Sequence, residues 1–532
     1  MNRAIVCIWA VAVVLTASAT SVTFSGGAGR VGGSCALVEQ AGCRVLVDCG
    51  SLYGEDVFDG CRDKSGFAFD PHGIDHVLVS HAHQDHAGRV PELIRAGFDG
   101  TVWMTAPTRE LLSIVWQKQV MYEDGAQSWR WTRRSHKKGR MTVHWRDDCD
   151  WLGKIAKENL VSFTGPYREI SRQLETNVAD RVYVGLCATC QQLELDAVLK
   201  HVRAVDFDRE VRIGPFGVVF RPVKHLPGAA SVTFSDGESR FVFSGDLGTL
   251  RSRLTERIDP AEKADVVFVE CTYGDASYGD AQTVAAEYQR FQRTVGETVR
   301  AGGIAWIPAF ALDRSQRVLI EIAEGMKAGL IDRDVPVYYL SPSSRRMAQA
   351  YVEHPGWFDN GSVAGLAEIF RRSKKSFDAK KSAQGAGILL TTSGMMDAGC
   401  SLSYLPDLAP RTNVTVCIVG YQAPGTHGCR LKQGARRLKV ADAGKKTVEV
   451  NCRVEDFACF SGHGDAREVE RWLANNWQSK IYLIHGDRKN LEARRQGLRE
   501  RFHADVEIAE PGRKYDIIPQ SKICQQTEGV VK

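Results

Sequence analysis

The sequence predicts an α/β protein whose main part is a sandwich of β-sheets. Short apolar runs rich in β-branched residues, such as 45–47 and 266–269, indicate buried strands. Between residues 303 and 419, strand-like runs alternate with helix-like segments, of which 314–326 is one. Alternating strands and helices favour a largely parallel sheet in this region.

The composition is that of an ordinary globular protein. Of the 532 residues, 43% are hydrophobic and 25% are charged, and the formal net charge is +5 at pH 7. This length is sufficient for two or more domains with sizeable cores. A net charge this small says little about partners, so composition alone leaves the function open.

A cluster of histidines follows the strand-like run 77–79. His81, His83 and His86, with Asp85 between them, fall within six consecutive residues. On an extended or tightly turned segment, His81 and His83 can reach one metal ion, while Asp85 and His86 turn towards a second. Nitrogen and carboxylate ligands mixed in this way suit zinc, with manganese or iron open. Since three of the 14 histidines gather here, an ordinary structural role for all three is the poorer explanation.

Further acids and imidazoles follow strand-like runs elsewhere in the chain. A six-residue motif cannot complete the coordination of two ions, so other segments must supply ligands. Side chains at strand ends converge on one edge of a sheet, where ligand sites of α/β proteins generally lie. The candidates are Asp48, His225, Asp246, Glu270, His463 and His485.

These motifs, in this order, resemble the metallo-β-lactamase fold in its β-CASP branch. That branch contains nucleic-acid hydrolases, among them RNase J-type enzymes and the cleavage subunit of mRNA 3′-end processing. The resemblance covers residues 22–512. The matching blocks are Leu46-Val47-Asp48, the histidine cluster, Val223-Lys224-His225, Ser244-Gly245-Asp246-Leu247-Gly248, Val269-Glu270-Cys271-Thr272-Tyr273-Gly274, Phe460-Ser461-Gly462-His463-Gly464-Asp465 and Leu483-Ile484-His485-Gly486-Asp487. Blocks typical of the branch also lie at 307–311, 393–396 and 419–426.

The resemblance implies a metallo-β-lactamase αββα sandwich with an inserted α/β β-CASP cap domain. We expect the core over residues 21–274, with a basic and aromatic insertion at 117–190. The β-CASP domain is expected over 275–458, the return of the core over 459–512 and a tail over 513–532. The cap domain would lie over the metal site and leave a cleft that admits a single nucleic-acid strand.

The resemblance further implies two zinc ions per chain, with Mn²⁺ as the alternative. A hydroxide shared by the two ions would attack phosphorus. Asp48 would orient the histidine cluster, because ligating imidazoles commonly donate their second N–H to a carboxylate. The resemblance implies that one ion is held by His81, His83 and His225 and the other by Asp85, His86 and His485. Asp246 would bridge both ions.

Three residues form the expected catalytic set: Asp85, Glu270 and His463. His463, oriented by Glu270, resembles the family residue that contacts the scissile phosphate and protonates the leaving group. Ser393 and Gly394 lie in a turn that is expected to approach the nucleic-acid backbone. Together with His463 they form the expected substrate-binding residues.

The function predicted in this way is zinc-dependent hydrolysis of single-stranded RNA, by an endo- or an exoribonuclease. A hydrolase of a small lactam, thioester or phosphodiester would share the metal motif but does not explain the cap domain, Glu270 or His463. A non-catalytic RNA-processing scaffold would be expected to lack ligands, and here every one is present. The basic and tryptophan-containing run 130–146 is either an RNA-guiding surface or an exposed insertion. A homo-oligomer is left open.

The N-terminus and the cysteines bear on location. Residues 1–20 have the layout of a secretory signal, or of an extension upstream of the true start, and are too short to span a membrane. We therefore expect no integral membrane association. The 15 scattered cysteines are typical of reduced thiols and favour the cytoplasm, with export as the alternative if the signal is real. Cys187 and Cys190 form a CxxC pair that is either a structural zinc site or two ordinary thiols.

Overall fold

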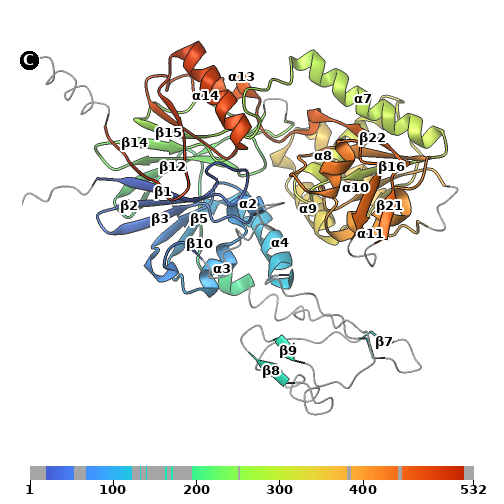
Figure 1. The fold of residues 1–532 in the computed structure, drawn as a ribbon, viewed down its shortest axis with the longest axis horizontal. Coiled ribbons are helices and arrows are strands. Elements are labelled where there is room, and N and C mark those ends of the chain that lie inside the picture. The colour runs from blue at the N-terminus through green and yellow to red at the C-terminus, as the bar shows by residue number, and fades with distance from the viewer. Residues whose placement is uncertain are drawn as a thin grey trace, which may run out of the picture.

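Two seven-stranded mixed sheets face each other in the larger lobe (Figure 1). The computed structural model describes residues 19–52, 67–122, 195–249, 252–379, 385–440 and 446–519, with four short strands between 132 and 171. The first sheet has the order β10 (Val202–Val205), β5 (Thr101–Thr105), β4 (His76–Leu78), β3 (Cys43–Val47), β2 (Cys35–Gln40), β1 (Ser21–Gly26), β25 (Lys514–Asp516). The second has the order β11 (Glu210–Ile213), β12 (Phe216–Pro222), β13 (Ala230–Ser235), β14 (Arg240–Phe243), β15 (Val266–Glu270), β23 (Lys480–Ile484), β24 (Val506–Ile508).

Aromatic side chains fill the space between these two sheets. In the second sheet, Phe234 stacks on Phe241 with ring centroids 4.8 Å apart, and Phe243 on Phe268 at 4.7 Å. Phe24, from β1 of the first sheet, meets Phe268 edge-on at 5.4 Å. All five rings are buried, and each contributes about 1.5–3 kcal/mol by leaving water. This packed layer gives the strand ends that carry the candidate ligands a rigid base.

Helices cover the outer faces of the sandwich. In the first half of the chain these are α2 (Gln84–Ala87), α3 (Val90–Arg95) and α4 (Ala106–Tyr122), and α4 contacts β5 and β10. In the last part of the chain, α13 (Ala466–Trp472) and α14 (Arg488–Phe502) follow, and α14 contacts β23 and β24. Asp465 begins α13 with a capping box, because its carboxylate accepts from the backbone of Glu468 while the Glu468 side chain accepts from Asp465 N.

The smaller lobe contains a five-stranded sheet in which every pair of neighbours is parallel. Its order is β17 (Val337–Tyr339), β18 (Gly387–Thr391), β16 (Ile304–Pro308), β19 (Val414–Ile418), β22 (Arg453–Asp456). The accompanying elements are α7 (Ala281–Arg300), α8 (Arg314–Lys327), α9 (Pro342–Glu353), α10 (Asn360–Arg372), α11 (Gly399–Leu408), α12 (His427–Lys432) and the hairpin of β20 (Arg437–Val440) and β21 (Lys446–Glu449). The parallel sheet predicted from the alternating pattern is present, and the helix predicted over 314–326 is α8.

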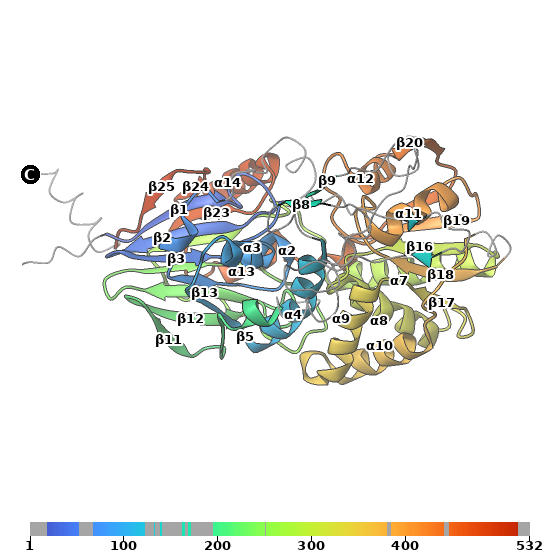
Figure 2. The ribbon, with the colours of Figure 1, turned by 90° about the horizontal axis from the view of Figure 1, so that it is seen from below.

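The chain path makes the smaller lobe an insertion. The chain leaves the larger lobe after β15, builds the whole smaller lobe, and returns through the 3₁₀ turn Ala458–Phe460 to α13 and β23. Strand β23 then pairs in parallel with β15, the strand at which the chain left. Figure 2 shows the two lobes side by side, with α4 and α9 at their junction.

Several predicted features lie outside the described residues. These include residues 1–18 of the N-terminal segment, the pair Cys187 and Cys190, and most of the segment 117–190. Within that segment only β6 (Thr132–Arg133), β7 (Gly139–Arg140), β8 (Ser162–Thr164) and β9 (Glu169–Ser171) are described, beside the end of α4. In the described part of the chain, no helix is both long and apolar enough to cross a bilayer.

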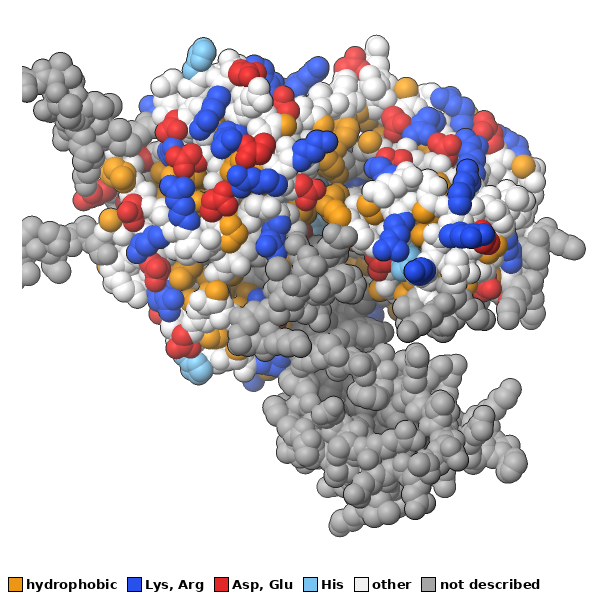
Figure 3. All heavy atoms as spheres, viewed as in Figure 1, with side chains coloured by type: hydrophobic (Ala, Val, Ile, Leu, Met, Phe, Trp, Pro, Cys, Tyr) orange, Lys and Arg blue, Asp and Glu red, His pale blue; other side chains and the backbone are white. Residues whose placement is uncertain are grey.

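Surface charges are mixed on the face that Figure 3 shows. Lys and Arg side chains are interspersed with Asp and Glu side chains over both lobes, and hydrophobic side chains gather where the lobes meet. This even mixture agrees with the small net charge of +5.

Candidate metal centre

The histidine cluster occupies the turn after β4 and the first residues of α2, and Asp48 holds it there. Asp48 follows β3, is buried, and accepts hydrogen bonds from Ser80 N at 2.7 Å and Ser80 Oγ at 2.8 Å. Its Oδ2 also accepts from His86 Nδ1 at 2.7 Å. Asp48 has a φ of 63°, in the left-handed region that few non-glycine residues adopt. Asp48 thus contacts both the turn before the cluster and the His86 ring, and the orienting role predicted for it stays a prediction.

Gly50 allows the chain after Asp48 to approach the cluster closely. A Cβ at Gly50 would stand 1.6 Å from the carbonyl oxygen of Asp85, so no larger residue fits without moving that segment. Two backbone hydrogen bonds, from Cys49 N to His86 O at 2.7 Å and from Ser51 N to Gln84 O at 2.8 Å, join this segment to the histidine cluster. The sequence 48–51 therefore fixes the backbone of the first candidate ligands.

The first group of candidate ligands consists of His81, His83, His225 and Asp246, whose ligand atoms all lie within 4.8 Å of one another. His83 Nδ1 is 3.1 Å from His81 Nε2 and 3.1 Å from His225 Nε2. Two nitrogens bound to one zinc at about 2.0–2.1 Å in tetrahedral geometry would be about 3.3–3.4 Å apart. The three imidazoles thus have nearly the spacing that a common ion requires.

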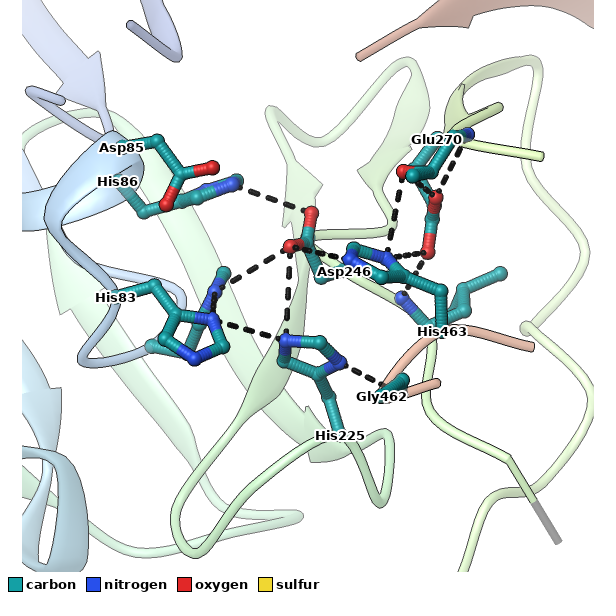
Figure 4. A network of polar contacts seen from close by, with 12 residues as sticks. His83, Asp85, His86, His225, Asp246, Glu270, Gly462 and His463 are labelled. Carbon is teal, nitrogen blue, oxygen red and sulfur yellow. Dashed lines mark hydrogen bonds and ion pairs between the residues drawn. The ribbon is translucent and has the colours of Figure 1, made fainter. Parts of the chain in front are cut away.

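The second group consists of Asp85, His86 and His485. His485 Nε2 is 3.4 Å from both His86 Nε2 and Asp85 Oδ2. Asp246 lies between the groups, as Figure 4 shows: its Oδ2 is 3.5 Å from His81 Nε2, and its Oδ1 is 3.2 Å from His86 Nε2. Asp246 Oδ1 is buried and has no hydrogen-bond partner in the described part of the chain. An orphaned carboxylate oxygen facing imidazole nitrogens fits a bridging metal ligand.

Outer hydrogen bonds direct the ring nitrogens of these histidines. His225 Nδ1 donates to Gly462 O at 2.8 Å, and His86 Nδ1 donates to Asp48, so in both rings Nε2 faces the site. Thr272 Oγ1 donates to Glu270 Oε2 at 2.6 Å and therefore accepts from His485 Nδ1 at 3.1 Å. Each ring consequently presents a lone pair to the site, as metal ligation requires.

Burial sets the protonation of the first group. It lowers the pKa of His81 and His225 well below the usual value, and that of His83 to about 4. These imidazoles are therefore neutral near pH 7. Burial raises the pKa of Asp246, but the surrounding imidazoles, with His485 first, outweigh it and leave the pKa well below its usual range. Burial lowers the pKa of His86, but the carboxylates of Asp246 and Asp48 outweigh it and raise this pKa well above the usual value, so the neutral rings are those of the first group. Three neutral imidazoles beside an ionised carboxylate are a donor set that a divalent cation needs.

A third cluster joins Glu270 and His463 to Asp246. Glu270 ends β15 and is buried, and its Oε1 accepts from Leu247 N at 2.9 Å and from His463 Nδ1 at 2.9 Å. His463 Nε2 consequently points into the site, 3.8 Å from Asp246 Oδ2. Burial lowers the pKa of His463, but the charges of Glu270 and Asp246 raise it more, to about 10.

The inserted domain reaches this centre through α8. Arg317 is buried, and its guanidinium donates to His225 O and Ser461 O, each at 3.2 Å, while Nε pairs with Asp313 at 2.8 Å. It thereby ties α8 to both loops that carry His225 and His463. Sequence reasoning missed Arg317 and Thr272. For Thr272 the block around Glu270 contained a usable signal, because a hydroxyl two residues after a strand-end acid can reach back to that acid.

The two predicted substrate-binding residues of the inserted domain lie close to the centre. Ser393, together with His83, Gln84 and Phe310, lines a cleft of about 180 Å³ between the lobes. Ser393 Oγ is buried and has no hydrogen-bond partner among the described residues. Gly394 lies against the backbone of Phe310, where a Cβ would be 2.9 Å from Phe310 N. The structure thus brings the predicted ligands together and places Ser393 on a cleft that it shares with His83.

Three family models match consecutive parts of the chain. The model of the Metallo-beta-lactamase superfamily matches residues 28–290, that of the Beta-Casp domain residues 315–431, and that of the Zn-dependent metallo-hydrolase RNA specificity domain residues 447–509. This order confirms the predicted fold, a metallo-β-lactamase domain with an inserted β-CASP domain.

Similar proteins of known name cover most of the chain. Transcription termination factor FttA of Methanosarcina mazei is 30% identical over 495 residues, or 88% of this chain and 67% of that protein. FttA of Methanocaldococcus jannaschii is 28% identical over 488 residues, which again cover 88% of this chain and 67% of that protein. A ribonuclease of Thermus thermophilus is 28% identical over 482 residues, or 88% of this chain and 93% of that protein. The chain spans about two thirds of the length of the archaeal relatives. It belongs to the metallo-β-lactamase superfamily, in the β-CASP branch.

Proposed function

We propose that this protein hydrolyses phosphodiester bonds of RNA at a centre of two divalent metal ions. The observation that carries the proposal is the pair of ligand groups joined by Asp246, with His463 beside them and the inserted domain above. The description of the third family model as an RNA specificity domain and the name of the Thermus thermophilus relative support RNA as the substrate. Zinc is the expected metal, because imidazoles predominate among the ligands, and Mn²⁺ is the alternative.

The ligands divide between the ions as the two groups divide in space. His81, His83 and His225 would hold one ion, Asp85, His86 and His485 the other, and Asp246 both. When bound, such a pair of ions lowers the pKa of water to about 7 and neutralises charge on a phosphate. Asp85 therefore belongs to the catalytic set through its ion, and Asp48 keeps His86 in the ligating tautomer.

His463 would act on the leaving group. Its Nδ1 is fixed by Glu270 Oε1 at 2.9 Å, so its Nε2 can only face the space above Asp246. A proton held on Nε2 can pass to the departing ribose oxygen, which would otherwise leave as a poor, strongly basic alkoxide. Glu270 does not touch the substrate in this arrangement. It holds the imidazole in place.

The cleft between the lobes would take a single strand. His83 and Ser393 line the same cleft, so a strand bound in it would lie beside both of them. The unpartnered Ser393 Oγ can donate to a phosphate oxygen there. We place the enzyme in the cytoplasm, where RNA is abundant and the described cysteines, all of them free thiols, remain reduced.

The test uses RNAs labelled next to a 5′-monophosphate or a 5′-triphosphate, with metal content measured on each preparation. The wild type is compared with His83→Ala and Asp246→Asn, and the exposed His72→Ala and Asp75→Asn serve as matched controls. We expect hydrolysis by the wild type and the controls, and its loss in the two site variants. Mononucleotides released only from the monophosphorylated RNA indicate a 5′ exonuclease, and internal fragments indicate an endonuclease. A wild type that binds two metals and cleaves neither RNA would refute the proposal.

A further inference from the structure

Arg314, the arginine that begins α8, is buried with two of its three guanidinium nitrogens unpartnered among the described residues. Its side chain is 7% exposed, and neither Nε nor Nη1 has a hydrogen-bond partner in the described part of the chain. No described carboxylate lies within ion-pair distance, and the acid next to it in sequence, Asp313, pairs instead with Arg317 at 2.8 Å. Leaving buried donors of a charged group unsatisfied costs several kcal/mol. A group kept at such a cost is explained by a ligand that satisfies it.

The guanidinium lies at the edge of the metal centre. A Cβ built on Gly462 would be 3.2 Å from Arg314 Nη2 and 3.1 Å from His225 Cε1, so the arginine and the His225 ring both pack against the Gly462 backbone. Gly462 O accepts from His225 Nδ1, and His463 is the next residue (Figure 4). Arg314 is thus adjacent to a candidate ligand and to the candidate proton donor at once, and the missing side chain of Gly462 makes room for it.

Electrostatics limits what can occupy the space in front of Arg314. Two divalent ions beside a buried guanidinium repel it, so the arrangement is favourable only when an anion lies between them. The His225 ring beside it supplies no negative charge, and Asp246 faces the ligand groups through both of its oxygens. A phosphate that reaches the ions from the cleft brings the missing anion. Such a phosphate would lie beside His463, and this is where the phosphodiester bond to be broken is expected to lie.

We propose that Arg314 contacts a non-bridging oxygen of the scissile phosphate, a catalytic role that rests on the proposed function of the site. The guanidinium neutralises charge that grows on that oxygen as phosphorus becomes five-coordinate, and takes no proton from it. Arg317, one helical turn later, fixes the distance between Arg314 and the metal centre, because it ties α8 to the loops that carry His225 and His463. The inserted domain would therefore supply part of the chemistry in addition to binding RNA.

The experiment compares the metal-loaded wild type with Arg314→Met, Arg314→Lys and the control Arg293→Met. Arg293 is an exposed arginine on α7 of the same domain, so the control removes the same charge. Two substrates are used: an RNA oligonucleotide and bis(4-nitrophenyl) phosphate, which has a phosphodiester but no nucleic-acid chain. Bound metal, melting temperature and the affinity for inorganic phosphate are measured on each protein.

We expect Arg314→Met to keep two metals and to lose kcat about 10²–10³-fold on both substrates, as removal of a donor to a developing oxyanion does. Its affinity for inorganic phosphate should fall about tenfold or more, Arg314→Lys should be intermediate in both, and Arg293→Met should match the wild type. The lysine variant keeps the test open if the methionine variant does not fold.

Three results overturn the inference. Unchanged kcat and phosphate affinity in both Arg314 variants would show that the guanidinium does not touch the phosphate. A loss confined to RNA, with the small phosphodiester hydrolysed normally, would place Arg314 on a distant part of the strand. A loss of bound metal would make it a positioning residue. A wild type that hydrolyses neither substrate would instead refute the proposed function.

Discussion

Replacing Asp48 by Asn is predicted to weaken one of the two metal sites without removing any ligand. In the wild type, Asp48 Oδ1 accepts from Ser80 N at 2.7 Å, and Oδ2 accepts from His86 Nδ1 at 2.7 Å. An Asn side chain has only one acceptor oxygen, and the Ser80 backbone N–H requires it. The amide NH₂ must then stand where Oδ2 stood, facing His86 Nδ1.

Two donors cannot face each other, so His86 would respond by changing tautomer. Its proton would move from Nδ1 to Nε2, the nitrogen 3.2 Å from Asp246 Oδ1 and 3.4 Å from His485 Nε2. A protonated Nε2 cannot ligate a metal. Loss of such an orienting partner lowers metal affinity about 10–100-fold, or about 1.4–2.7 kcal/mol. The larger loss should fall on the ion of Asp85, His86 and His485, because His86 bonds to Asp48 Oδ2 directly. In the other group, His81 reaches this oxygen only through Ser80 Oγ.

The assay is a competition titration of metal-free protein with a chromogenic zinc chelator, which separates a tight from a weak site. Asp48→Asn should retain one tight ion and bind the second about 10–100-fold more weakly. The exposed Asp75→Asn, which tests loss of a carboxylate from the same lobe, should retain both. Two equally tight ions in Asp48→Asn would refute the tautomer reasoning, and equal weakening of both would show that the variant disturbs the whole loop.

Three further results are expected. His463→Ala should lose far more activity on RNA than on bis(4-nitrophenyl) phosphate, whose leaving group departs without a proton; equal losses would contradict a proton-donor role. Burial raises the pKa of Glu256 to about 7. The hydrogen bond from Gly228 N and the charge of Lys224 lower this pKa, but by less. The ionised carboxylate destabilises the folded protein, and this effect develops as pH rises from about 4.5, the pKa in the unfolded chain, to about 7. At pH 8 the free energy of unfolding of Glu256→Gln, measured with urea, should exceed that of the wild type by on the order of 2 kcal/mol, and below pH 4.5 the two should be equal. A difference that does not change with pH would contradict this prediction. Arg317→Met should lower the free energy of unfolding by about 3–5 kcal/mol in the same assay, because Asp313 loses its buried partner; a loss under about 1 kcal/mol would mean that Arg317 does not hold the lobes together.

The fold was largely predictable because its determinants are local. Strands such as β15 are continuous apolar runs that end in an acid, and this pattern alone predicts both the strand and the place of Glu270. The alternation after residue 303 predicted the parallel sheet for the same reason. The predicted ligands meet in space because parallel and neighbouring strands bring their ends to one edge.

The residues that sequence reasoning missed depend on contacts between distant segments. Arg314 and Arg317 open a helix whose pattern is typical of a surface helix, and arginines there are usually exposed. They are buried because the loop of Ser461 and Gly462 folds against them from the other lobe. No periodicity in α8 records that contact. The segment 117–190, which the sequence marks as basic and aromatic, stays a prediction, since most of it lies outside the described residues.

The central claim, RNA hydrolysis at two metal ions joined by Asp246, is tested most directly by one titration. Metal-free protein is titrated with zinc, and bound metal and cleavage of a labelled RNA are measured on the same samples, with Asp246→Asn beside the wild type. Cleavage should remain near zero up to one ion per chain and rise to its limit as the second ion binds, and Asp246→Asn should bind both ions weakly and cleave nothing. Full cleavage by metal-free protein, or two ions bound without cleavage, would contradict the claim.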